Sequence, residues 1–141
     1  MRTQLMLFLG GKYLFSARVA KFGLKPTAYR GAEPTVCLRD ILLHTGTVIV
    51  PIDHVWVTVG KTFARFNPRK GDRIAFRAWV REYHKYDYET GLEKLDYCIE
   101  RLSALDLVAG GGNGQDFATF WSMLGQSGKF ITNRIVVPCM A

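Results

Sequence analysis

The segment from Gly71 to Tyr83 carries the residue types and spacing best suited to binding chemistry. With the period-two alternation of a strand, one side of this segment is apolar and the other combines arginines with aromatic rings. That second side comprises Arg73, Ala75, Arg77, Trp79, Arg81 and Tyr83. Guanidinium groups interleaved with rings suit a polyanion that also offers flat bases. The alternative, that the arginines sit on the rings for structural reasons alone, stays open.

Composition places the chain among folded globular proteins with a basic surplus. It has 141 residues, is 48% hydrophobic and carries a formal net charge of +7. This length fits one domain that can build a core without disulfide or metal staples. The surplus is concentrated in residues 1–40 and 60–101, which hold the candidate binding surface. A basic balance favours contact with a polyanion.

Five strand-like runs recur with turn signals between them, and a short amphipathic helix separates the third from the fourth. The strands are expected over about residues 13–22, 35–44, 48–59, 73–83 and 95–108, and the helix over 61–66. Regular short strands with a helix in that position predict an all-β, five-stranded OB-fold, a Greek-key barrel. Residues 1–109 would form this domain. The glycine-hinged tail, residues 110–141, would dock on the barrel or on a neighbouring subunit, because its aromatic residues are costly to expose.

Two loops are expected to flank the predicted binding face. One is the Gly/Pro-bounded loop over residues 23–34, and the other is a tip over Tyr86–Gly91. The predicted nucleic-acid-binding residues are Arg18, Lys25, Tyr29, Arg30, Trp56, Arg77, Trp79, Arg81, Tyr83, Lys85, Tyr86 and Tyr88. Bases would stack on the rings, and the cations would hold the phosphates. For either tryptophan the alternative is packing beneath the tail, and for the tyrosines it is anchoring of the loops.

No catalytic constellation emerges from the sequence, and neither an enzyme nor a cofactor is expected. His54 follows Asp53, but neighbours on a strand point to opposite faces, so Asp53 is not expected to orient His54 unless a bulge intervenes. No phosphate-binding glycine loop and no clustered carboxylates are visible. The histidines and cysteines lack metal-ligand spacing, so no metal site is expected.

The three cysteines are far apart, without a CxxC pair, and suggest no disulfide framework. Cys37 and Cys98 are expected as small buried residues, and a reducing, cytoplasmic setting follows as the default. The apolar run Leu5–Leu9 is too short for a signal peptide. No run approaches the roughly 20 apolar residues of a membrane span, so no membrane partner is expected.

Three segments together resemble an OB-fold family of bacteria, plasmids and phages whose members are similar to single-stranded DNA-binding proteins. They are Val36-Cys-Leu-Arg-Asp-Ile-Leu-Leu43, Asp53-His-Val-Trp56 and the Gly71–Tyr83 segment. The family pattern is DHxW on one strand followed by GDxIxFxAxVxxY on the next, and the likeness covers roughly residues 13–108. The resemblance implies an OB-fold and a part in replication or recombination.

The leading hypothesis is binding of single-stranded DNA with little sequence preference by a homo-oligomer, with RNA left open as a ligand. The second is an OB-fold protein-interaction or assembly module without intrinsic nucleic-acid binding. The third is a structural component of a phage or other particle. A common fold hosts many functions, so the pattern leaves all three open.

Overall fold

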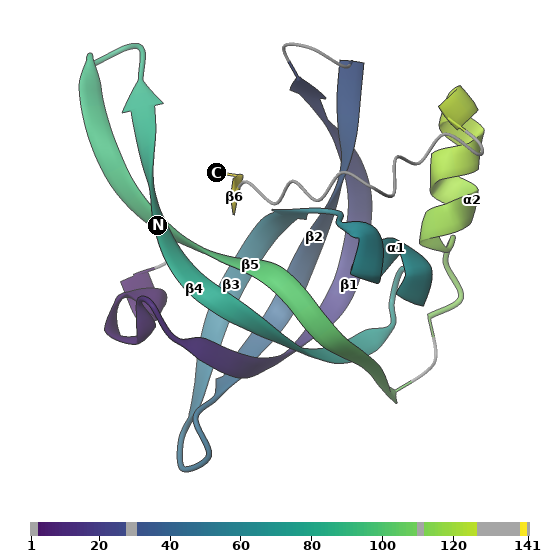
Figure 1. The fold of residues 1–141 in the computed structure, drawn as a ribbon, viewed down its shortest axis with the longest axis horizontal. Coiled ribbons are helices and arrows are strands. Elements are labelled where there is room, and N and C mark those ends of the chain that lie inside the picture. The colour runs from purple at the N-terminus through teal and green to yellow at the C-terminus, as the bar shows by residue number, and fades with distance from the viewer. Residues whose placement is uncertain (1–2, 28–30, 110–111, 127–138, 141) are drawn as a thin grey trace.

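The fold is built mainly from one antiparallel sheet, as the computed structural model shows for residues 3–27, 31–109, 112–126 and 139–140 (Figure 1). Its elements are η1 (Thr3–Phe8), β1 (Lys12–Thr27), β2 (Gly31–His44), β3 (Ile49–Thr58), α1 (Lys61–Phe66), β4 (Arg73–Asp87), β5 (Leu92–Ala109), α2 (Phe117–Trp121), η2 (Ser122–Gln126) and β6 (Cys139–Met140). The sheet order is β5-β4-β1-β2-β3-β6. The all-β class and the short helix between the third and fourth strands are therefore confirmed.

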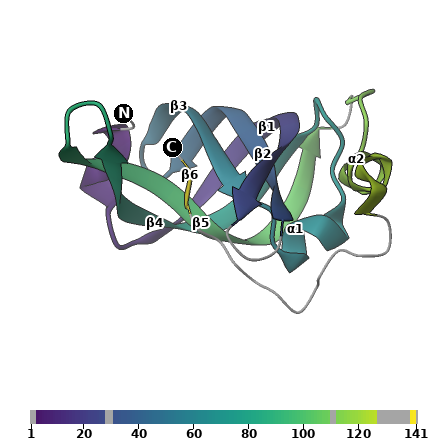
Figure 2. The same ribbon diagram turned by 90° about the horizontal axis from the view of Figure 1, so that it is seen from above.

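The alternation read from the sequence sends one side of each strand into a common core. Phe15 of β1 and Phe76 of β4 are directly opposite in the register, and their stacked rings lie 5.6 Å apart between centroids. Both side chains are completely buried. The sheet is curled, as Figure 2 shows. α1 contributes the buried Phe63 to the core inside it. Residues on the opposite side of β1 and β4 therefore point away from the core.

The two segments expected as loops belong to extended hairpin arms. β1 continues to Thr27 and β2 begins at Gly31, with Lys25 opposite Glu33. The β4–β5 hairpin is likewise paired as far as Asp87 and Leu92. Figure 1 shows both arms extending toward the same side of the molecule. Antiparallel pairing satisfies the backbone N–H and C=O groups of the arms, and this outweighs the local turn signals.

The sheet does not close into a barrel. Within the described parts of the chain, no ladder joins β5 to β3, and the partner of β3 on its outer side is the two-residue β6. The described strands thus form an open, curled sheet, where the sequence predicts the partly open Greek-key barrel of an OB-fold. One physical reason is that β6 pairs with the outer side of β3 at Trp56 and Val57, where β5 would otherwise pair. In addition, β5 is irregular in its pairing with β4. Arg101 and Ala104 have positive φ angles of 59° and 51°, and the β4–β5 register shifts on either side of Arg77. Such bulges bend a strand and disrupt its ladder.

The first part of the tail packs on its own chain. Phe117 of α2 is buried, with its ring centroid 5.6 Å from Phe22 and 6.3 Å from Phe63. Asn67 accepts a hydrogen bond from the N–H of Ala118 at 2.8 Å. These contacts tie α2 to the end of α1. The part of the tail between residues 127 and 138 lies outside the described residues.

Asp116 caps α2, and its removal gives a pH-dependent prediction. Its carboxylate accepts the backbone N–H of Thr119 at 2.8 Å. Hydrogen bonds from the side chain of Thr119 and then from this backbone N–H lower the pKa of Asp116 below its usual 3.8. We expect Asp116→Ala to reduce the free energy of unfolding at neutral pH by about 1 kcal/mol. A lowered folded pKa gives stability that is present above the unfolded pKa and is lost as pH falls through the folded value. The difference between the variant and the wild type in urea unfolding should therefore shrink in strong acid.

The matched control for that experiment is Asp116→Asn. Asparagine is as good an N-cap as aspartate, so this variant should keep most of the stability at neutral pH and lack the acid dependence. A loss for Asp116→Ala that is unchanged between neutral and strongly acidic urea series would contradict the cap's role.

One cysteine differs from its prediction. Cys98 is disulfide-bonded, whereas the sequence spacing suggested no disulfide. Long separations conceal such pairing, because connectivity depends on the fold. Cys37 is a free, buried thiol, and burial raises its pKa. The cytoplasmic prediction drew on unpaired cysteines, so the bond at Cys98 removes that argument. No helix among the described residues has the length and apolar character needed to span a membrane.

Candidate functional site

Trp79 lies on the outward side of β4 with two cations over its ring. The Cζ atom of Arg81 is 4.8 Å from the ring centroid, and the Nζ atom of Lys12 is 6.0 Å from it. Lys12 occupies the β1 position directly opposite Trp79. The indole is half-buried and does not belong to the core. Lys12, Trp79 and Arg81 with Glu100 of β5 are called the Trp79 cluster below.

Glu100 and Asp96 of β5 hold two of the predicted binding residues. The Nε atom of Arg81 is 3.1 Å from a carboxylate oxygen of Glu100, which is itself opposite Trp79 in the register. The hydroxyl of Tyr83 donates to Asp96 at 3.2 Å. The ion pair orients the guanidinium onto the ring and offsets part of its charge. For Arg81 and Tyr83, then, a structural role accompanies any binding role.

Arg77 differs from the other arginines of β4. Its side chain is exposed and, across the described residues, has neither an ion pair nor a hydrogen bond. Arg73, by contrast, donates to the hydroxyl of Ser16 at 3.1 Å. Arg77 is opposite Leu14 of β1, on the same outward face as Trp79. This places an unneutralised guanidinium next to a half-exposed indole.

Trp56 forms a second, separate patch. The Nζ atom of Lys21 lies 5.4 Å from the Trp56 ring centroid. The ring also covers Gly23, where an added Cβ would come within 3.0 Å of an indole carbon. Trp56 faces away from the buried Val55 and Val57, so both predicted stacking tryptophans lie outside the core.

The register separates the two tryptophans along β1. Trp79 is opposite Lys12, whereas the row containing Trp56 crosses β2 at Cys37 and reaches β1 at Lys21. That offset corresponds to roughly 30 Å of extended strand. The structure therefore presents two aromatic patches rather than one continuous groove.

The remaining predicted residues are scattered over the arms and β1. Arg18 is paired with Asp40 at 2.9 Å between exposed side chains. Tyr86 and Tyr88, exposed at the tip of the β4–β5 arm, make an edge contact with ring centroids 4.8 Å apart. Lys25 is half-buried on the β1–β2 arm. Tyr29, Arg30 and the side chain of Lys85 lie outside the described residues.

His54 and Asp53 contact each other, contrary to the expectation from strand alternation. The Nδ1 atom of His54 is 3.1 Å from a carboxylate oxygen of Asp53. The reason is a local irregularity: Ile52 and Val55 are both buried, so the two residues between them both lie outward. Asp40 on the adjacent strand has a φ of 51° at the same level. Both partners are solvent-exposed, and the described residues contain no cluster of three metal-ligating side chains.

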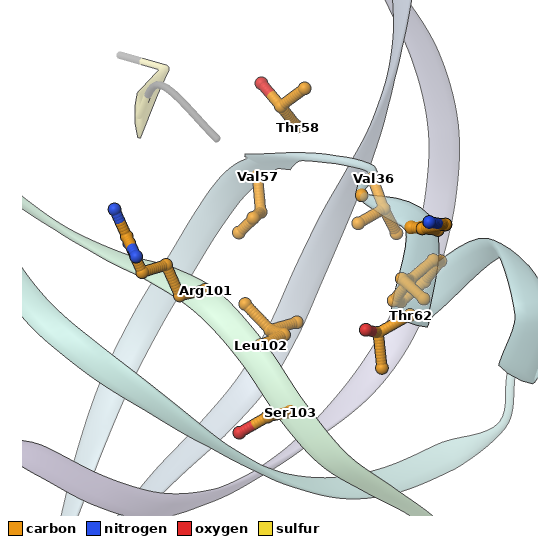
Figure 3. A pocket seen from close by; sticks show the side chains of 10 residues that line it. Val36, Val57, Thr58, Thr62, Arg101, Leu102 and Ser103 are labelled. Atoms are coloured by element: carbon orange, nitrogen blue, oxygen red, sulfur yellow. The ribbon is translucent and has the colours of Figure 1, made fainter. Parts of the chain in front are cut away.

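A cavity of about 240 Å³ lies between the end of β3, the start of α1 and the bulged part of β5 (Figure 3). Arg101 and Lys61 line it, and neither was predicted as a site residue. Period-two alternation alone gives no signal for a bulge, and Lys61 reads as the start of an ordinary amphipathic helix. Lys12 was missed for a related reason, because a cross-strand partner depends on register.

Comparison of the chain with family models, curated proteins and solved structures finds no match. The resemblance noted in the sequence therefore stays a prediction.

Proposed function

We propose that this protein binds single-stranded DNA with little sequence preference through the outward face of β1 and β4, in support of replication or recombination. The observation that carries the proposal is Trp79, a half-exposed indole beneath two cations and beside the unpaired Arg77. A flat ring offers a stacking surface to any base, and the cations offer partners to the phosphates. An interface built this way tolerates sequence, because every base has a π-face.

The assignment of this sheet to the OB-fold is part of the same proposal. The strand order β5-β4-β1-β2-β3 with α1 after the third strand supports an open OB-fold, although β3 and β5 are not joined by a ladder. OB-folds are partly open barrels that bind oligonucleotides on one face. A cytoplasmic setting, where single-stranded DNA is generated, is part of this proposal.

The test is a titration of a fluorescently labelled oligothymidylate of about twelve nucleotides, a length within the span of one such domain. If three cations contact phosphates, the logarithm of the affinity should fall with the logarithm of the salt concentration with a slope of about −2. Fluorescence anisotropy at two or more salt concentrations measures that slope. A duplex of matched length is the control, since paired bases cannot stack on Trp79. Absence of binding at low salt ends the proposal.

An assembly module is the second candidate, and the exposed apolar surface of η1 favours it. Met6 is 53% and Leu7 is 84% exposed on η1, the same helix that buries Leu5 in the core. Such side chains are costly to leave in water and mark association surfaces when they are contiguous. Light scattering over a range of concentrations, with Leu7→Ser as the variant, decides the point. A homo-oligomer that the substitution dissociates supports this role, and a monomer throughout excludes self-assembly through η1.

A further inference from the structure

The cavity between β3, α1 and β5 lies where β3 and β5 approach each other without a ladder between them. The residues that line it are Val36, Val57, Thr58, Gly60, Lys61, Thr62, Phe63, Arg101, Leu102 and Ser103. We call it the seam cavity. Its volume of about 240 Å³ is below the range of about 300–1,000 Å³ typical of pockets for larger ligands. It therefore has room for one ring system with a substituent.

The interior of the seam cavity is apolar. Val57 and Phe63 are 2% and 3% exposed, so they present hydrocarbon to the cavity from the core side. Figure 3 shows Val57 of β3 and Leu102 of β5 pointing toward each other, with Thr62 of α1 on one side and Arg101 on the other. A flat ring between two aliphatic side chains would lose water-exposed surface on both of its faces.

Cations and hydroxyls contribute the polar part of the lining. Lys61 comes from α1 and Arg101 from β5, and Ser103 adds a hydroxyl. The lining contains no carboxylate. Within the part of the chain that the structure describes, neither cation makes an ion pair or a hydrogen bond through its side chain. An uncompensated pair of positive charges around an apolar slot favours a ligand that is both flat and anionic.

The backbone at Arg101 supports a functional role for this side chain. Glu100 is opposite Trp79 and Ser103 is opposite Arg77, so Arg101 and Leu102 together oppose a single β4 residue. Arg101 takes up the bulge with a left-handed φ of 59°. That conformation is strained for an arginine, and such strain is found where a side chain must be aimed at a site. Because of the bulge, the consecutive residues Arg101 and Leu102 both line the cavity, whereas regular alternation would place only one of them there.

We propose that the seam cavity binds one nucleoside phosphate unit, with the base between Val57 and Leu102 and phosphate oxygens on Arg101 and Lys61. The unit is either a free mononucleotide or one nucleotide of a bound single strand. The strand version rests on the proposed function, and the mononucleotide version does not. A guanidinium and an ammonium from two different elements can each donate to an oxygen of the one phosphate.

The experiment compares Arg101→Gln and Lys61→Gln with Arg65→Gln, an exposed residue of α1 outside the cavity lining. Calorimetry measures binding of thymidine monophosphate, thymidine and inorganic phosphate, and anisotropy measures binding of the labelled oligothymidylate. We expect each cavity variant to lower the affinity for whichever ligand binds, the strand or the mononucleotide, by about fivefold or more. The reason is that a charge-assisted hydrogen bond is lost. Arg65→Gln should leave the mononucleotide affinity unchanged.

Arg101→Gly guards against a loss of folding. Glycine adopts a positive φ without strain, so this variant should melt at the same temperature as the wild type or higher, while it loses binding. A lower melting temperature would instead show that the arginine side chain stabilises the bulge. Arg101 would then have a structural role, and the proposal that it binds a ligand in the cavity would fail.

The outcomes separate this proposal from the proposed function. In one outcome, substitution of Trp79 weakens strand binding, substitution of Arg101 or Lys61 does not, and no mononucleotide binds. This outcome overturns the cavity proposal and leaves the proposed function standing. Mononucleotide binding lost in Arg101→Gln, without strand binding, supports the cavity and overturns the function. Binding of inorganic phosphate as strong as that of thymidine monophosphate overturns the base slot between Val57 and Leu102.

Discussion

Replacing Trp79 by alanine is expected to weaken binding of single-stranded oligothymidylate by a factor of about 5 to 150, which corresponds to the roughly 1–3 kcal/mol that one stacked base contributes. The half-exposed ring is the largest flat surface on the outward side of β4, and Lys12 and Arg81 keep it in place. Its removal takes away the stacking surface and releases both cations from their positions. Anisotropy titrations of variant and wild type at one fixed salt concentration measure the effect, since affinity depends on salt.

Trp79→Phe is the matched control for this prediction. A phenyl ring retains a face for stacking and for the cations, so this variant should keep more affinity than Trp79→Ala. Thermal unfolding of both variants separates a binding defect from a folding defect. A folded Trp79→Ala protein with wild-type affinity would remove β4 from the binding face.

Glu100 and Arg101 connect the two candidate sites. These consecutive residues of β5 serve different surfaces, because neighbours on a strand point to opposite faces and the bulge begins only at Arg101. Glu100 is paired with Arg81 in the Trp79 cluster, whereas Arg101 lines the seam cavity. On the proposed function, a strand that stacks on Trp79 would pass close to β5. A phosphate of that strand would have to compete with Glu100 for Arg81. Arg77 has no such ion pair among the described residues, so it can bind a phosphate without this competition.

Hydrophobic alternation predicted the strands well where one side of each strand is buried in the core. The β4 prediction placed Phe76 inward and Trp79 outward, and the structure has both arrangements. The first arm was mistaken for a loop because residues 23–34 carry Gly and Pro signals. There the backbone pairing, such as Lys25 opposite Glu33, continues without help from a hydrophobic pattern.

The composition of the candidate site could be predicted only in part. Residue types on one strand indicated Arg77 and Trp79 as outward neighbours. The cation opposite Trp79, Lys12, depends on how β1 is aligned with β4, and a single sequence does not give this register. The role of Arg101 depends on a bulge, which inserts one residue and redirects the side chains around it. The bond at Cys98 depends on tertiary proximity as well.

The outward face of β4 can act as proposed only if its inward face is fixed, and Phe76→Ala tests that support. Phe76 is completely buried and stacks on Phe15 across the β1–β4 pair. Removing the ring leaves a cavity at the centre of the core, so the free energy of unfolding should fall by about 3–5 kcal/mol. Urea unfolding at neutral pH measures this loss. Arg77→Ala is the control from the next position along the strand, where an exposed side chain should change stability by no more than about 0.5 kcal/mol. Equal effects of the two substitutions would mean that the two faces of β4 are assigned incorrectly, and the Trp79 cluster would then have no rigid strand behind it.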